Sequence, residues 1–166
     1  MVKNIFYILS FILVSCQGIS QKNTEKKNTP QISDTEYKVT KTDKEWRSSL
    51  TDLQYFILRK AGTENPGSSK HLMNKQEGVY ACAGCNTPLF KSAHKFDSGT
   101  GWPSFDREIK GNVGYDIDYK IGYKRTEEHC ATCGGHLGHV FNDGPKNTTG
   151  ERHCINGAAL KFIPKK

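Results

Sequence analysis

Two short segments decide the fold: CAGC at Cys82–Cys85 and CATC at Cys130–Cys133. Two Cys-x-x-Cys turns can present four thiolates to one tetrahedral Zn²⁺, and Gly84 and Gly134 suit the tight turns that this requires. Four thiolates make a closed, structural site whose metal contributes folding free energy to a domain with a small core. A thioredoxin-like redox motif and two disulfides are the alternatives, although neither pair lies in a βαβ pattern.

The residues around these pairs predict a mainly β domain behind short helices. Thr42–Glu45 has the capping-box pattern, and apolar residues then recur at helical spacing, so one or two amphipathic helices should run to about Lys60, before Gly62–Gly67. Short strands without alternating helices favour antiparallel sheets. The expected strands are Val79–Tyr80, Leu89–Phe90, Tyr115–Tyr123, Leu137–Phe141 and Ala158–Ile163, and the expected core residues of the helices are Trp46, Leu50, Leu53 and Ile57.

The first residues predict export. Lys3 precedes an apolar run, Ile5–Val14, of signal-peptide length and too short to span a bilayer. The run ends in Leu-Val-Ser-Cys16, which resembles the lipobox of bacterial lipoproteins, whose cysteine becomes lipid-modified; a plain secretory signal is the alternative. We expect a signal peptide over 1–15, a flexible polar tether over 16–41, a domain over 42–166, and a lipid-anchored protein facing the periplasm or the cell exterior.

Composition disfavours a nucleic-acid-binding protein. The chain has 166 residues, enough for one domain with some extra length, and a formal net charge of +7. Its lysines and arginines are scattered among acids, with no cluster beyond Lys26-Lys27 and Lys165-Lys166. A basic face for a phosphate backbone is therefore not expected. Asn147-Thr-Thr149 has the pattern of a glycosylation acceptor but is interpreted as a surface loop.

One cysteine of the domain, Cys154, belongs to neither pair and is a candidate nucleophile. The stretch HLGHVFNDGPKNTTGERHCIN at His136–Asn156 surrounds it with an arginine and a histidine that can favour the reactive thiolate. Two further histidines can deliver a proton to a leaving oxygen, and an acid could orient one of them. A thiol hydrolase would use the same set, and spacing alone does not separate the two. The flanking residues are Arg152 and His153, the two histidines are His136 and His139, and the acid is Asp143.

Four separated motifs, in order, resemble the methionine sulfoxide reductase B family over about Lys44–Ile163. They are GVYACAGC at Gly78–Cys85, KFDSGTGWPSF at Lys95–Phe105, HLGHVFNDG at His136–Gly144 and GERHCIN at Gly150–Asn156. The resemblance implies two antiparallel β-sheets with short N-terminal helices and a structural zinc site, a fold of the Mss4-like or β-tent type. It also implies repair of one methionine sulfoxide epimer, the R form, in oxidised proteins. A thioredoxin-like or small-thiol reductant, no organic cofactor and a monomeric state are expected.

The resemblance also assigns roles. Cys154 is implied to attack the sulfoxide sulfur and become a sulfenic acid as methionine leaves. Trp102 is implied to pack against the S-methyl group, a favourable contact for an aromatic ring, although a core role is the alternative. His136 could instead only orient its neighbour. The implied residues are His136, His139 and Asn156 at the sulfoxide oxygen, Arg152 and Asp143 beside the thiolate, Trp102 and Phe105 at the substrate, and Arg125 and Glu127 as a functional or a structural ion pair.

Two departures from the family pattern affect these expectations. Thr100 stands where many members carry a resolving cysteine. We therefore expect the sulfenic acid to be reduced directly by an external thiol, since an acylated Cys16 would take no part in disulfide exchange. Lys120-Ile121-Gly-Tyr123 replaces the frequent Ser-His-Gly-Met, so an imidazole is missing near the substrate. A function of another class, a zinc-knuckle binding module, would not need Trp102, Cys154 and both histidines.

Overall fold

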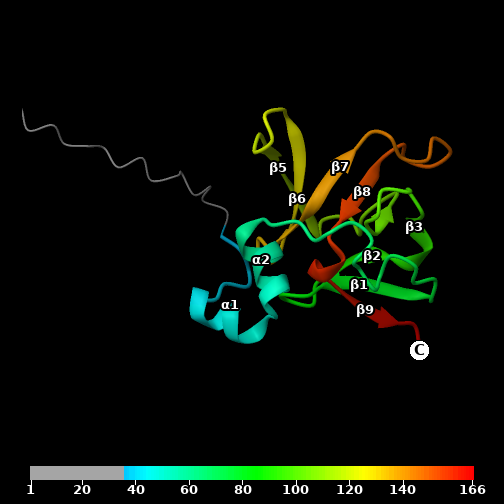
Figure 1. The fold of residues 1–166 in the computed structure, drawn as a ribbon. Coiled ribbons are helices and arrows are strands. Elements are labelled where there is room, and N and C mark those ends of the chain that lie inside the picture. Colours follow the sequence, from blue (N-terminus) through cyan, green and yellow to red (C-terminus); the bar gives the residue numbers. More distant parts are fainter. Residues whose placement is uncertain (1–35) are drawn as a thin grey trace, which may run out of the picture. The chain divides into compact units, whose positions relative to one another are not determined.

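The computed structural model describes residues 36–166 and arranges them as two short helices followed by two antiparallel sheets (Figure 1). No helix within this part of the chain is both long and apolar enough to cross a membrane. The expected signal peptide, the lipidated Cys16 and most of the tether lie outside the described residues. The helices are α1 (Asp43–Ser49) and α2 (Asp52–Lys60), and the strands are β1 (Gly78–Cys82), β2 (Pro88–Lys91), β3 (Lys95–Phe96), β4 (Ser104–Phe105), β5 (Val113–Asp118), β6 (Arg125–Cys130), β7 (His136–Phe141), β8 (Arg152–Ile155) and β9 (Leu160–Pro164), with 3₁₀ turns at Ser92–His94 and Gly157–Ala159.

The two sheets confirm the predicted fold class. One has the strand order β2-β1-β9 and the other β3-β4-β8-β7-β6-β5, with antiparallel pairing throughout. Aromatic rings from both sheets meet in the core: Phe105 of β4 stacks on Phe90 of β2 with ring centroids 4.5 Å apart and contacts Tyr80 of β1 edge-on. Such pairs add to the burial of apolar surface and tie the small sheet to the large one.

Both helices begin with a capping box. Thr42 accepts from the backbone of Glu45, as predicted, and Thr51 forms the same arrangement with Gln54. Each cap satisfies backbone N–H groups that the first helical turn leaves unpaired. Trp46, Leu50 and Ile57 are buried, but Leu53 is 47% exposed, so its assignment to the core was wrong. Because the second cap restarts the helix at Thr51, Leu53 lies in the first turn of a new helix and faces solvent.

The strand predictions fail where a strand is polar or turns early. Strand β5 ends at Asp118, and 119–123 form an exposed hairpin turn closed by a hydrogen bond from the Gly122 N–H to the Tyr119 carbonyl. Strand β9 begins only at Leu160, because Ala158 belongs to the preceding 3₁₀ turn. Strands β6 and β8, RTEEHC and RHCI, were not predicted because most of their residues are polar and no alternation of apolar and polar residues marks them.

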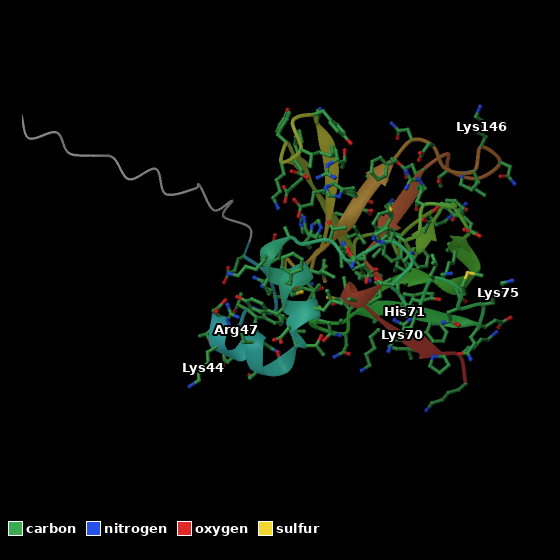
Figure 2. The ribbon with its side chains drawn as sticks, viewed as in Figure 1. Lys44, Arg47, Lys70, His71, Lys75 and Lys146 are labelled. Atoms are coloured by element: carbon green, nitrogen blue, oxygen red, sulfur yellow. The ribbon has the colours of Figure 1, made fainter. Side chains whose placement is uncertain are left out.

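Basic side chains point outward from separate parts of the domain. Lys44 projects from α1, Lys75 from the segment before β1, and Lys146 from the loop between β7 and β8 (Figure 2). That loop also carries Asn147, which is exposed as expected for a surface segment.

Candidate active site and metal centre

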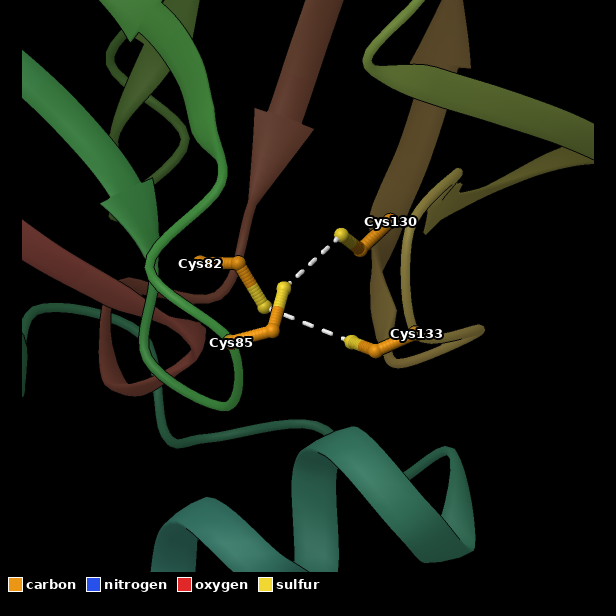
Figure 3. Close-up of side chains that lie close together, drawn as sticks. All are labelled: Cys82, Cys85, Cys130 and Cys133. Atoms are coloured by element: carbon orange, nitrogen blue, oxygen red, sulfur yellow. Dashed lines mark hydrogen bonds between the residues drawn. The ribbon is translucent and has the colours of Figure 1, made fainter. Parts of the chain in front are cut away.

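Four cysteines from two turns form one cluster (Figure 3). One ligand atom from each lies within 4.8 Å of the others. The Sγ atoms of Cys82 and Cys133 are 3.8 Å apart, and those of Cys85 and Cys130 are 3.5 Å apart. Zn–S bonds of about 2.3 Å at tetrahedral angles separate the sulfurs by about 3.8 Å, whereas a disulfide needs about 2.05 Å. The cluster therefore fits a tetrahedral metal ion and not a pair of disulfides.

The chemistry of this donor set also fits a cation. Hydrogen bonding to the neighbouring thiols, chiefly Cys130, raises the pKa of Cys82, because four thiolates cannot share so small a volume unless a positive charge stands among them. Cys82, Cys130 and Cys133 are buried and Cys85 is half-buried, so no ligand position is left open to substrate. Such a site holds the fold together and does not take part in a reaction.

The two knuckle turns share one backbone device. In each, the residue after the second cysteine has a positive φ, 61° at Asn86 and 67° at Gly134, and donates its N–H to the carbonyl of the first cysteine. Gly84 lies within the first turn, but the left-handed position there is taken by Asn86 and not by the glycine. A Cβ at Gly84 would lie 3.4 Å from the ring of Trp46, which is an ordinary packing distance.

Cys154 is positioned on β8, apart from the cluster. Its Cα pairs with that of Ser104 on β4 and with that of His139 on β7, so the thiol lies between the strands that carry the other candidate residues. The hydroxyl of Thr100 lies 4.0 Å from the Cys154 Sγ. That contact places Thr100 at the thiol itself, as the position of a resolving cysteine would require.

The environment of Cys154 combines burial with one positive charge. Burial raises the pKa of this thiol, and the Arg152 guanidinium acts against that rise. Arg152 is held by a bidentate pair with Asp143, Nε to Oδ1 at 2.8 Å and the second nitrogen to Oδ2 at 2.9 Å. The Asp143 carboxylate therefore fixes the arginine beside the thiol and does not orient a histidine. The thiolate is favoured less than the sequence suggested, because burial outweighs the arginine.

Each histidine of β7 has its own carboxylate. His136 Nδ1 lies 2.6 Å from Glu127 Oε1, and His139 Nε2 lies 2.8 Å from Asp118 Oδ2. Burial lowers the pKa of His139 although Asp118 acts to raise it. The ring centroids of the two histidines are 5.6 Å apart. If each carboxylate accepts a ring N–H, the opposite ring nitrogens, Nε2 of His136 and Nδ1 of His139, are left to handle a proton.

Arg125 and His153 each pair with a buried carboxylate. Arg125 pairs with Asp118 at 2.5 Å and not with Glu127. Although burial acts to raise it, hydrogen bonds from the Lys120 backbone, His139 and Arg125 lower the pKa of Asp118 overall. His153 is wholly buried, with Nδ1 2.6 Å from Glu128 Oε1. The expectation that His153 favours the Cys154 thiolate was therefore wrong, because neighbouring residues of a strand point to opposite faces.

Of the remaining expected site residues, Trp102 is partly exposed, whereas Asn156 and Phe105 are buried. Trp102 is half-buried, and its indole N–H donates to the Glu64 carbonyl at 3.2 Å. Asn156 is buried: its Oδ1 accepts the Glu64 N–H at 2.9 Å and its Nδ2 donates to the Leu137 carbonyl at 3.0 Å. These two bonds fix the Asn156 amide beside β7, and its implied role at the sulfoxide oxygen stays a prediction. Phe105 is 0% exposed and stacks in the core, so its assignment to the substrate site was wrong.

Sequence reasoning missed three acidic residues that hold residues of the site or of the strands that carry it. Asp118 was hidden inside an expected continuous strand, and its partnership with His139 follows only from the hairpin β5–β6. Glu128 lies on a strand that was not predicted. Glu64 lies in an irregular segment, and no local pattern marks it. A cavity of about 970 Å³ lies elsewhere, lined by residues such as Leu72, and does not include Cys154.

Comparisons with known proteins identify a family to which this fold and site correspond. The SelR domain family matches residues 50–164. The "Peptide methionine sulfoxide reductase MsrB" of Leifsonia xyli subsp. xyli is 50% identical over 131 residues, which cover 78% of this chain and 94% of that protein. The protein of the same description from Leptospira interrogans is 50% identical over 127 residues, which cover 76% and 96%. Among solved structures, the Mis18 'Yippee-like' domain is 15% identical with a TM-score of 0.45 and covers 55% of this chain and 99% of that one.

The fold and the site thus define a SelR domain: two antiparallel sheets, a closed four-cysteine cluster and a separate thiol between polar strands. The matched region covers more than half of the chain, and the relatives are matched over nearly their whole length. The chain belongs to the peptide methionine sulfoxide reductase B family, which confirms the resemblance found in the sequence.

Proposed function

We propose that this chain is a peptide-methionine (R)-S-oxide reductase that repairs oxidised proteins with Cys154 as its nucleophile. The observation that carries the proposal is the position of Cys154. It is a free thiol outside the metal cluster, lies beside Arg152 and Thr100, and pairs through its backbone with His139. Membership of the family supports methionine sulfoxide reduction as the reaction that these residues catalyse.

In the first step, the Cys154 thiolate attacks the sulfoxide sulfur. His136 or His139 delivers the proton that the sulfoxide oxygen needs, through the ring nitrogen that its carboxylate partner leaves free. The sulfur–oxygen bond of the substrate breaks, methionine leaves, and Cys154 carries the oxygen as a sulfenic acid. The atoms balance, since one thiol and one sulfoxide give one sulfenic acid and one thioether.

An external thiol completes the cycle. One thiol attacks the sulfenic acid and releases water, and a second thiol reduces the mixed disulfide and restores Cys154. Thr100 supports this route, because a hydroxyl stands 4.0 Å from the Cys154 sulfur where a resolving thiol would stand. The other cysteines within 36–166 are the four of the cluster. A thioredoxin-type protein or a small thiol would be the donor.

The four-cysteine cluster would hold Zn²⁺ through Cys82, Cys85, Cys130 and Cys133. The spacing of the sulfurs and the all-thiolate donor set support zinc, which would stabilise the fold as a closed tetrahedral site.

The protein would be an exported lipoprotein. Replacement of Cys16 with Ala tests this, because it should move the protein from the membrane fraction to the soluble one.

Activity on separated epimers tests the function. The full chain, with dithiothreitol as reductant, should convert N-acetylmethionine-R-sulfoxide to the thioether and leave the S epimer unchanged. Cys154→Ser should lose this activity and retain its metal content and folding. If the Ser variant reduced the sulfoxide as fast as the parent chain, Cys154 would not be the nucleophile. If the parent chain reduced neither epimer, the repair function would fail and a binding module would remain.

A further inference from the structure

Glu64 lies in the irregular segment between α2 and β1, and its polar groups contact Trp102 and the backbone and side chains of 156–158, which follow Cys154. Its N–H donates to Asn156 Oδ1 at 2.9 Å, and its carbonyl accepts the Trp102 indole N–H at 3.2 Å. Its carboxylate accepts two backbone N–H groups, those of Gly157 and Ala158, the second at 3.0 Å. A single residue therefore joins Trp102 to the chain that leaves Cys154.

A buried carboxylate at this position is costly unless it is fully bonded. Glu64 is 5% exposed, and a carboxylate removed from water must recover its lost hydration through hydrogen bonds. The two N–H donors at the start of the 3₁₀ turn Gly157–Ala159 supply this compensation. Gly157 is also needed for it, because any Cβ there would collide with the Ser69 hydroxyl and press on Glu64 Oε1.

Trp102 has no other hydrogen bond that would hold its ring. The indole N–H is the single polar group of a tryptophan, so the Glu64 carbonyl fixes the rotation of the ring. Thr100, which contacts the thiol, lies two residues before Trp102, and Ser104, which pairs with Cys154, lies two residues after it. The orientation of Trp102 relative to the Cys154 sulfur therefore depends on where Glu64 is held.

From these contacts we infer that Glu64 is a positioning residue that sets the orientation of Trp102 against the thioether end of the substrate. The inference rests on the proposed function, because it assigns the clamp to sulfoxide binding. Glu64 acts through Trp102 and does not touch the thiol. Its loss should weaken substrate binding and leave the reactivity of Cys154 unchanged.

The test compares Glu64→Gln with Glu77→Gln, which makes the same chemical change at an exposed glutamate paired with Lys165. Glu64→Gln places an amide N–H against a backbone donor and should release the clamp. We expect KM for N-acetylmethionine-R-sulfoxide to rise roughly five- to tenfold, the size of a lost sulfur–aromatic contact, with kcat changed less than twofold. The rate of alkylation of Cys154 by iodoacetamide should stay the same, and Glu77→Gln should match the parent in every reading.

A second measurement reports on the ring without turnover. The chain has two tryptophans, so in a Trp46→Phe background the tryptophan fluorescence comes from Trp102 alone. Acrylamide should quench this fluorescence more strongly in Glu64→Gln than in Glu77→Gln. In a Trp102→Phe background, which lacks the indole N–H, Glu64→Gln should add no further rise in KM, because coupled residues are not additive.

The inference fails if KM and quenching in Glu64→Gln equal those of Glu77→Gln, or if kcat and alkylation fall while KM holds. Should Glu64→Gln not fold, Glu64→Asp, which keeps the charge but shortens the reach, takes its place under the same criteria. An inactive parent chain would sink the proposed function instead, and the quenching comparison would still decide whether Glu64 holds Trp102.

Discussion

At the scale of single residues, the reactivity of Cys154 is a balance between burial and one guanidinium. Burial raises the pKa of the thiol, and Arg152, fixed by Asp143, limits that rise. The reactive form is the thiolate, so the rate at which Cys154 reacts with an electrophile should increase with pH up to a pKa above the ordinary thiol value. Burial and the opposing guanidinium therefore set the pH at which this thiol ionises.

Replacing Arg152 with Met should shift this range upward. Removal of the opposing charge should raise the pKa of Cys154 further and slow alkylation at neutral pH several-fold. The measurement is the iodoacetamide rate of Cys154 across pH 6 to 11, followed by mass spectrometry. Arg152→Lys is the matched control and should shift the curve less. An unchanged curve in the Met variant would show that the arginine does not act on the thiol.

Asp118→Asn should lower the pKa of His139. The carboxylate raises the pKa of His139, which burial has already lowered, so its loss should lower that pKa further and reduce the protonated fraction at neutral pH. The pKa of Asp118 is lowered in the fold, so its ionised form stabilises the protein above the unfolded value, and this contribution disappears as pH falls through the folded pKa. NMR titration of the His139 ring is the measurement. Glu127→Gln, which releases His136 instead, should leave the His139 titration nearly unmoved.

At the scale of elements, the strands that carry the chemistry were the hardest to predict. Apolar strands such as β1 and β2 follow from their composition, whereas β8 carries Cys154 in a polar run whose strand character comes from pairing on both sides. The metal cysteines and the thiol could be recognised from spacing and family motifs. The carboxylates at Asp118 and Glu64 could not, because each meets its partner only after distant segments pair.

Gly138→Ala should break the element that aligns the site. Gly138 on β7 pairs with Ile155 on β8, and a Cβ at Gly138 would collide with the Cys154 carbonyl. Overpacking of this kind costs about 1–3 kcal/mol, and here backbone must move, so the upper end is expected. Urea unfolding measures the loss. Gly122→Ala in the hairpin turn, where nothing lies within 4 Å, should cost only about 1 kcal/mol through its positive φ. Equal losses in both variants would show that the collision is relieved cheaply.

At the scale of the whole molecule, the cysteine cluster joins halves of the chain that are far apart in sequence. Cys82 is the last residue of β1 in the small sheet and Cys130 the last residue of β6 in the large one, and Cys85 and Cys133 lie in the turns that follow. Leu58 of α2 packs close to Gly84 and Gly135 beside the two turns. A metal at this point therefore links both sheets and the helix, whereas the thiol at Cys154 depends on β4, β7 and β8.

Removal of a metal bound by this cluster should consequently destabilise the whole fold and not merely inactivate the protein. Chelation at neutral pH should lower the thermal midpoint by more than 10 °C, because binding free energy at a structural site is folding free energy. Circular dichroism follows the transition, and atomic absorption counts the metal released. Cys130→Ser should reproduce the loss without chelator, while Cys154→Ser should keep the parent midpoint within a few degrees. A chelated chain that retained its midpoint would mean that the core of aromatic residues between the sheets suffices for stability, and that the four thiols serve another purpose.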